Sequence, residues 1–247
     1  MLALEYKKSI VRFIWMKLLA KRVPSVVTGP GGMLRLSRIA PPKLPGKDWV
    51  RVRPVLSGIC GSDLATITGH SSIYLSAFTS FPFVPGHEVV GNVVEIGSSV
   101  SKFGLRDRVV LEPALGCDVR GFEQLCLPCE RGHYSNCERV TKGNISAGIQ
   151  TGFCKDTGGG WGTELVAHET QLHSIPDNVT DEAAVMVEPL SCAIHGVLRA
   201  SIPRGASILV VGSGTIGLLT IAAIKKFSPD STITCTAKYA HQQDMAR

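Results

Sequence analysis

The chain has 247 residues, of which 44% are hydrophobic and 19% are charged. This composition is that of a globular protein with one or two domains, and it excludes a disordered or fibrous chain. The formal net charge is +6, but the basic residues are scattered, so nucleic acid is not an expected partner.

The N-terminal segment 9–20 is apolar, yet it is not expected to be a signal peptide or a membrane span. Arg12 and Lys17 interrupt it, no small-residue cleavage site follows, and the apolar run is far too short to cross a bilayer. We expect an opening strand followed by a short helix or loop insertion. No membrane partner is expected. The eight cysteines favour metal binding over disulfides, and we expect a cytoplasmic protein.

The first half of the chain consists of short segments rich in Val and Ile and broken by Gly and Pro. Alternating or Val-rich runs in such segments predict strands. They occupy residues 49–54, 87–96 and 107–111. The pattern is typical of a β-rich, barrel-like domain.

The pattern changes near residue 180, where Thr180 and the acids after it predict the start of a helix. Alternating strands and helices follow, as in a βαβ unit. We expect a helix over 190–200, a buried strand over 207–211, a helix to about 227 and a strand over 232–236.

These patterns predict a catalytic domain over residues 1–188 and the first part of a cofactor-binding domain over 189–247. A doubly wound dinucleotide domain normally has about six strands, and only two are predicted here. We therefore expect a C-terminally truncated chain.

One group of candidate metal ligands consists of Cys60, His87, Glu88 and Glu188. Thiolate, imidazole and carboxylate are zinc ligands, and a catalytic zinc site leaves one position open for water or substrate. Singly, each residue has an ordinary structural explanation, such as a buried thiol or a core histidine. The combination predicts a catalytic zinc site that would polarise an alcohol or carbonyl oxygen.

Two neighbours of Cys60 have expected roles in this site. Ser62 could carry the alcohol proton outward, and Asp63 could orient His87 as a hydrogen-bond acceptor. Together with Glu88, these residues are the expected catalytic group.

The segments 58–63, 85–91 and 187–196 resemble the active-site segments of zinc-dependent medium-chain alcohol dehydrogenases. The form of the third segment is similar to the polyol and threonine dehydrogenase branch. The resemblance implies a GroES-like barrel followed by a Rossmann domain, a homo-oligomer, and direct or water-mediated zinc ligation by Glu88 or Glu188. Family members commonly have a histidine where this chain has Ala65, which leaves the outer part of the proton path open.

A second group of cysteines lies in the expected lobe 117–137. The spacing of Cys126, Cys129 and Cys137 is typical of a metal site. The family lobe has a further cysteine at the position of Glu123. We expect Cys117 to supply the fourth thiolate of a structural zinc site; the alternatives are Glu123 as an oxygen ligand, or free thiols without metal.

The glycine motif that follows the strand 207–211 predicts dinucleotide binding. Gly212 permits a tight turn, Gly214 lets the backbone approach a pyrophosphate, and Gly217 allows close packing of helix and strand. Thr215 and Ile216 complete the loop at the N-terminus of the helix, which favours phosphate charge.

The position about 20 residues after the last glycine distinguishes NAD from NADP. An acid there would bind the ribose hydroxyls of NAD, but the chain has Ala237 followed by Lys238. Lys238 could pair with a 2′-phosphate. We therefore favour NADP over NAD.

The sequence as a whole predicts a zinc-dependent oxidoreductase with two zinc ions per chain, acting on a secondary alcohol or a polyol. The alternatives are a zinc-holding structural or binding module without turnover, and a zinc-free quinone reductase, which the metal-ligand set argues against. Thr66, Tyr74 and Phe78 are expected to line part of the substrate pocket.

Overall fold

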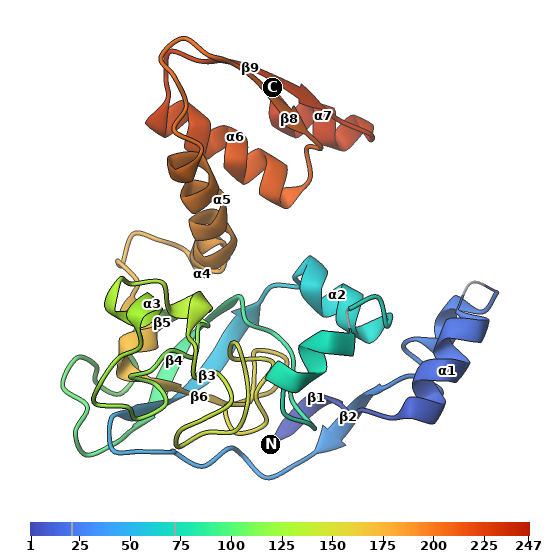
Figure 1. Cartoon of the computed structure of the whole chain (residues 1–247), viewed down its shortest axis with the longest axis vertical. Helices are drawn as coiled ribbons and strands as arrows, with labels where there is room; N and C mark the ends of the chain where they lie inside the picture. Colours follow the sequence, from blue (N-terminus) through green and yellow to red (C-terminus); the bar gives the residue numbers. More distant parts are fainter. Residues whose placement is uncertain (21, 72) are drawn as a thin grey trace. The chain divides into compact units, whose positions relative to one another are not determined.

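The computed structural model describes residues 1–20, 22–71 and 73–247 (Figure 1). The chain divides into two compact units, Met1–Val185 and Met186–Arg247. In the parts of the chain that the structure describes, no helix is long and apolar enough to cross a membrane.

The first unit is organised around a five-stranded antiparallel sheet. Its strand order is β6-β3-β4-β5-β7. The strands are β3 (Trp49–Ser57), β4 (Val89–Ile96), β5 (Arg108–Leu111), β6 (Leu165–His168) and β7 (Leu172–Ser174). Alternate apolar side chains from these strands, among them Val50, Val52 and Val93, form a buried core. The β-rich first part predicted from the sequence is thus confirmed.

A hairpin of β1 (Leu2–Tyr6) and β2 (Leu34–Arg38) forms a separate antiparallel pair. The connection between the two strands contains α1 (Ile10–Leu19) and a short 3₁₀ helix, Pro24–Val26. The hydroxyl of Ser9 accepts a hydrogen bond from the backbone N–H of Arg12 and caps α1. The predicted strand with a helical insertion is confirmed.

The remaining helices of the first unit are short and lie in its long connections. They are α2 (Gly61–Ile67), α3 (Leu127–Glu130) and α4 (Asp181–Ala184), with 3₁₀ helices at Ile73–Phe78, Tyr134–Asn136 and Glu169–Gln171. Thr180 caps α4 through a hydrogen bond from the N–H of Ala183, as the sequence predicts.

The second unit contains two parallel strands, β8 (Ser207–Val211) and β9 (Thr232–Thr236). They accompany α5 (Val187–Arg199), α6 (Thr215–Phe227) and α7 (Ala240–Ala246). Val197 of α5 packs against Ala223 and Ile224 of α6. The β8-α6-β9 order is the βαβ unit predicted from the sequence (Figure 1).

Candidate metal centre and cofactor loop

The register of β3 and β4 brings the first three candidate ligands together. Ser57, at the end of β3, pairs with Val89, at the start of β4. Cys60 follows β3, while His87 and Glu88 directly precede β4. The backbone N–H of Gly58 donates to the carbonyl oxygen of Glu88 at 2.8 Å and extends the pairing into the site.

The side chains of Cys60, His87 and Glu88 converge on one point. Their sulfur, ring nitrogen and carboxylate oxygen all lie within 4.8 Å of one another. His87 is 3% exposed, whereas Cys60 and Glu88 are half-buried. A sulfur, nitrogen and oxygen donor set of this size fits a zinc ion with an open position.

Asp63 interacts with two of these residues, Cys60 and His87. Its Oδ2 accepts a hydrogen bond from the backbone N–H of Cys60 at 3.0 Å, and its Oδ1 lies 3.6 Å from Nδ1 of His87. Burial raises the pKa of Asp63, while the charge of His87 and the N–H groups of Cys60 and Gly86 oppose that rise.

The environment of Cys60 favours its thiolate. A hydrogen bond with His87 lowers the pKa of the Cys60 thiol, burial raises it, and hydrogen bonds with Ser62 lower it further; the net shift is downward. The thiolate is the form of cysteine that binds a metal. The lowered pKa of Cys60 therefore makes its deprotonation for metal binding easier.

Glu188 lies in the second unit, in the first turn of α5. There its Oε1 accepts a hydrogen bond of 3.8 Å from the thiol of Cys192, one turn further along the helix. Its place in the zinc ligand set remains a prediction.

The second predicted metal group forms a compact cluster of thiols. The sulfur atoms of Cys117, Cys126, Cys129 and Cys137 all lie within 4.8 Å of one another, and all four residues are buried. Cys117 and Cys137 have their sulfurs 3.7 Å apart. Two thiolates bound at about 2.3 Å to a tetrahedral zinc would lie about 3.8 Å apart, so the cluster has the dimensions of a closed zinc site.

Cys117, and not Glu123, completes this group of four. Glu123 is exposed at the surface of the lobe, while the N–H of Cys126 donates to the sulfur of Cys117. Burial raises the pKa of Cys126, but N–H groups of Cys129 and Glu138 and the thiols of Cys117 and Cys129 lower it to about 7.

Arg120 holds the lobe from inside, and the sequence pattern gave no signal of this role. Its guanidinium is completely buried and donates to the carbonyl oxygens of Leu115, Lys142 and Gly148. These three residues come from different segments of the lobe. The side chain therefore fixes the loops that carry the cysteines.

The glycine loop between β8 and α6 has the conformation expected of a phosphate cradle. Gly212 has a φ of +99°, and Gly214 is the N-cap of α6. A side chain at Gly217 would collide with the carbonyl oxygen of Gly212. Thr215 and Ile216 are the first two residues of α6 and lie between Gly214 and Gly217. Space beside Gly214 is open, so a ligand could approach the backbone.

Lys238 follows β9 and is exposed. Its Nζ lies 5.2 Å from the ring centre of Tyr239, and its N–H donates to the side-chain oxygen of Gln242. In the same loop region, the hydroxyl of Ser213 donates to the carbonyl oxygen of Thr236 at 2.9 Å and ties the glycine loop to β9.

A large cavity opens onto the first metal group. Its volume is about 640 Å³, and Cys60, Ser62 and His87 are among its lining residues. Thr66 also lines it, whereas Phe78 is 43% exposed and is not among the lining residues. The side chain of Tyr74 lies outside the described part of the structure.

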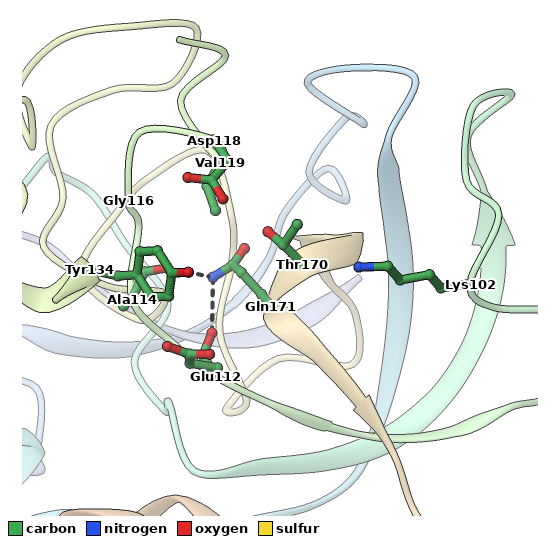
Figure 2. A pocket seen from close by; sticks show the side chains of 9 residues that line it. All are labelled: Lys102, Glu112, Ala114, Gly116, Asp118, Val119, Tyr134, Thr170 and Gln171. Carbon is green, nitrogen blue, oxygen red and sulfur yellow. Dashed lines mark hydrogen bonds between the residues drawn. The ribbon is translucent and has the colours of Figure 1, made fainter. Parts of the chain in front are cut away.

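A smaller hollow of about 240 Å³ lies beside the cysteine lobe (Figure 2). The amide nitrogen of Gln171 donates to the carbonyl oxygens of Glu112 and Ala114 at 3.1 Å each, and Lys102 lies on the other side of Gln171 (Figure 2). These two bonds engage the Gln171 amide within the protein, so its role here is to hold the segment 112–114 in place.

Comparison with known proteins gives consistent findings. The family model described as the alcohol dehydrogenase GroES-like domain matches residues 46–177. The chain is 31% identical over 194 residues to the sorbitol dehydrogenase of Halalkalibacterium halodurans, covering 78% of this chain and 50% of the relative. It is 32% identical over 197 residues to the L-idonate 5-dehydrogenase of Vitis vinifera, covering 78% of this chain and 49% of the relative.

Among solved structures, the 2R,3R-butanediol dehydrogenase of Bacillus subtilis is similar with a TM-score of 0.65 and 28% identity. That match covers 86% of this chain and 57% of the other. The chain thus spans about half the length of the curated relatives it matches.

Proposed function

Because the chain belongs to the alcohol dehydrogenase family with a GroES-like domain, we propose that the protein is a zinc-dependent oxidoreductase. It transfers hydride between an alcohol, either a secondary alcohol or a polyol, and NADP or NAD. The observation that carries the proposal is the convergence of Cys60, His87 and Glu88 within 4.8 Å, with Cys60 and His87 lining a large cavity. The non-catalytic module is not favoured, because the named relatives are dehydrogenases.

Cys60, His87 and Glu88 would hold the catalytic zinc, with Glu188 as the alternative carboxylate. When bound, zinc supplies a Lewis acid that lowers the pKa of an alcohol hydroxyl. Asp63 positions Cys60 through the 3.0 Å hydrogen bond and faces His87. It therefore acts through the ligands and does not touch the substrate.

Ser62 is the proposed first acceptor of the substrate proton. It lines the cavity beside Cys60 and is exposed, so its hydroxyl can pass a proton onward to water. Ala65 cannot extend this path. Solvent then takes the proton from Ser62.

The second unit is proposed to bind the dinucleotide. Gly212, Gly214 and Gly217 shape the loop, and the open N-terminus of α6 favours the pyrophosphate charge. The exposed Lys238 favours NADP, because its ammonium can pair with a 2′-phosphate.

The four-cysteine lobe is proposed to hold a second, structural zinc without a catalytic role.

Cysteines stay reduced, and so able to bind a metal, in a reducing compartment, which supports a cytoplasmic protein. We also propose a homo-oligomer.

Two measurements test this proposal. Metal analysis of the purified protein should find zinc, and the zinc content should fall in Cys60→Ser. Reduction of NADP and NAD should then be followed with a panel of secondary alcohols and polyols. Zinc without any hydride transfer in the full-length enzyme would refute the proposed activity.

A further inference from the structure

The insertion between β1 and β2 packs directly on the segments that carry the metal group. Phe13 and Met16 of α1 belong to one apolar cluster with Ile67, in α2, and Phe83, shortly before His87. A side chain at Gly69 would collide with Met16 and Phe13. The insertion is therefore a packed wall of the first unit.

This wall closes one side of the 640 Å³ cavity. Cys60, His87 and Ser62 line this cavity together with Ile10, Phe13 and Met33 of the insertion. A cavity of several hundred Å³ is large enough for a ligand the size of a substituted aromatic compound.

A chain of ring contacts leads from Tyr6 to His87. Tyr6 stacks on Phe83 at 5.1 Å, Phe83 contacts Phe153 at 5.2 Å, and Phe153 lies 6.1 Å from the imidazole of His87. A ligand that reaches the metal group would therefore lie against apolar ring faces.

Two of the polar side chains that line the cavity, Tyr6 and Thr66, are engaged in hydrogen bonds within the protein. The hydroxyl of Tyr6 donates to the sulfur of Met33 at 3.3 Å, and burial raises the pKa of Tyr6 to about 12. The hydroxyl of Thr66 donates to the carbonyl oxygen of Ser62 at 2.8 Å. Among the described lining residues there is no carboxylate. The other polar ones include Lys8, Gln150 and the hydroxyl residues Ser9, Ser71, Ser76 and Thr79, but most of the surface that faces the cavity is apolar.

Against the aromatic rings of this cavity, a polyol would lose the hydration of several hydroxyls without gaining hydrogen-bond partners for them. An alcohol with a single hydroxyl and a large apolar group would place the hydroxyl at the metal group and bury the rest on the rings. The cavity thus separates the two substrate classes that the proposed function leaves open.

We propose that the substrate is a secondary alcohol, or the corresponding ketone, that carries an aromatic-sized apolar group, and that Ile10, Phe13 and Met33 of the insertion determine this specificity. The inference rests on the proposed function. In such an oxidation the bound nicotinamide cofactor would accept the hydride from the alcohol carbon, and the hydroxyl proton would pass through Ser62 to water, which leaves the ketone.

Binding of 1-phenylethanol and of xylitol to the zinc-loaded chain, measured by saturation-transfer NMR titration, tests the inference without turnover. The phenyl compound should bind at least tenfold more tightly than xylitol. Ile10→Glu should weaken its binding about fivefold or more, because a carboxylate then faces the apolar group. Ile10 is 73% exposed, so this variant should fold.

Val11→Glu is the matched control, since Val11 is 65% exposed on the same helix and does not line the cavity. It should bind the phenyl compound within about twofold of the wild type. Equal or tighter binding of xylitol, or unchanged binding in Ile10→Glu, would overturn the inference. Selective phenyl binding without hydride transfer would support the cavity assignment and refute only the proposed activity.

Discussion

The carboxylate of Asp63 lies 3.6 Å from Nδ1 of His87, and Asp63 is 1% exposed. The same side chain accepts the N–H of Cys60. One buried acid thus fixes two proposed zinc ligands that are 27 positions apart in the sequence.

Asp63→Asn should weaken zinc binding at the first site by about 10- to 100-fold, because the ligands lose their supporting charge. Competition with a chelator measures the affinity. Asp177→Asn, at an exposed acid of the same unit, is the control and should bind zinc like the wild type. Equal affinity in both variants would remove Asp63 from the positioning role.

The two candidates for the fourth lobe ligand give opposite outcomes on substitution. Cys117→Ser should lose about one zinc per chain, since a closed site needs all four thiolates. Glu123→Gln should keep its zinc. Metal analysis by mass spectrometry decides, and zinc loss in the glutamine variant alone would reverse the assignment.

Arg120→Met should lower the free energy of unfolding by about 2–4 kcal/mol, because several buried carbonyl oxygens lose their donor. Urea unfolding of the zinc-loaded chain measures this change. The control is Arg204→Met, where the arginine side chain is 91% exposed; its stability should change by less than about 0.5 kcal/mol. Similar losses in both variants would argue against the internal role of Arg120.

The lowered pKa of Cys60 predicts a pH-dependent reactivity in the zinc-free chain. Folding favours the thiolate, so the stability it contributes is present above the ordinary thiol pKa and is lost as the pH falls through the lowered value. Alkylation of Cys60 by iodoacetamide, followed by mass spectrometry, should have its midpoint below that of an unperturbed thiol, and zinc should protect. A midpoint at or above the ordinary value would contradict this electrostatic account.

Lys238→Ala should raise the KM for NADP about five- to tenfold and leave the KM for NAD nearly unchanged, since only NADP has the 2′-phosphate. Initial rates of the full-length enzyme with each cofactor measure the effect. Lys226→Ala, at an exposed lysine in the last turn of α6, should change neither value. A strict preference of the wild type for NAD would refute the proposed role of Lys238.

The resemblance to zinc-dependent medium-chain alcohol dehydrogenases of the polyol-like branch, stated from the sequence, is confirmed by the family match and the relatives. Cys60, His87 and Glu88 were predictable because their residue types are specific and the turns around them limit where they lie. The glycine loop was predictable for a similar reason: Gly212 takes a positive φ, and no side chain fits at Gly217.

Other features depend on long-range packing, which short sequence patterns do not encode. In the sequence Arg120 cannot be told from a surface arginine, because two of its carbonyl partners, Lys142 and Gly148, are more than 20 positions away. The N-terminal insertion was predicted as a helix or loop, but its contact with Ile67 and Phe83 follows from the tertiary fold alone.

Zinc-dependent hydride transfer is tested most directly by the rate of NADPH formation from a secondary alcohol by the full-length enzyme, before and after its zinc is removed with a chelator. If zinc activates the alcohol, the rate should fall to background in the metal-free enzyme and return when zinc is added back. An undiminished rate in the metal-free enzyme would contradict this role of zinc.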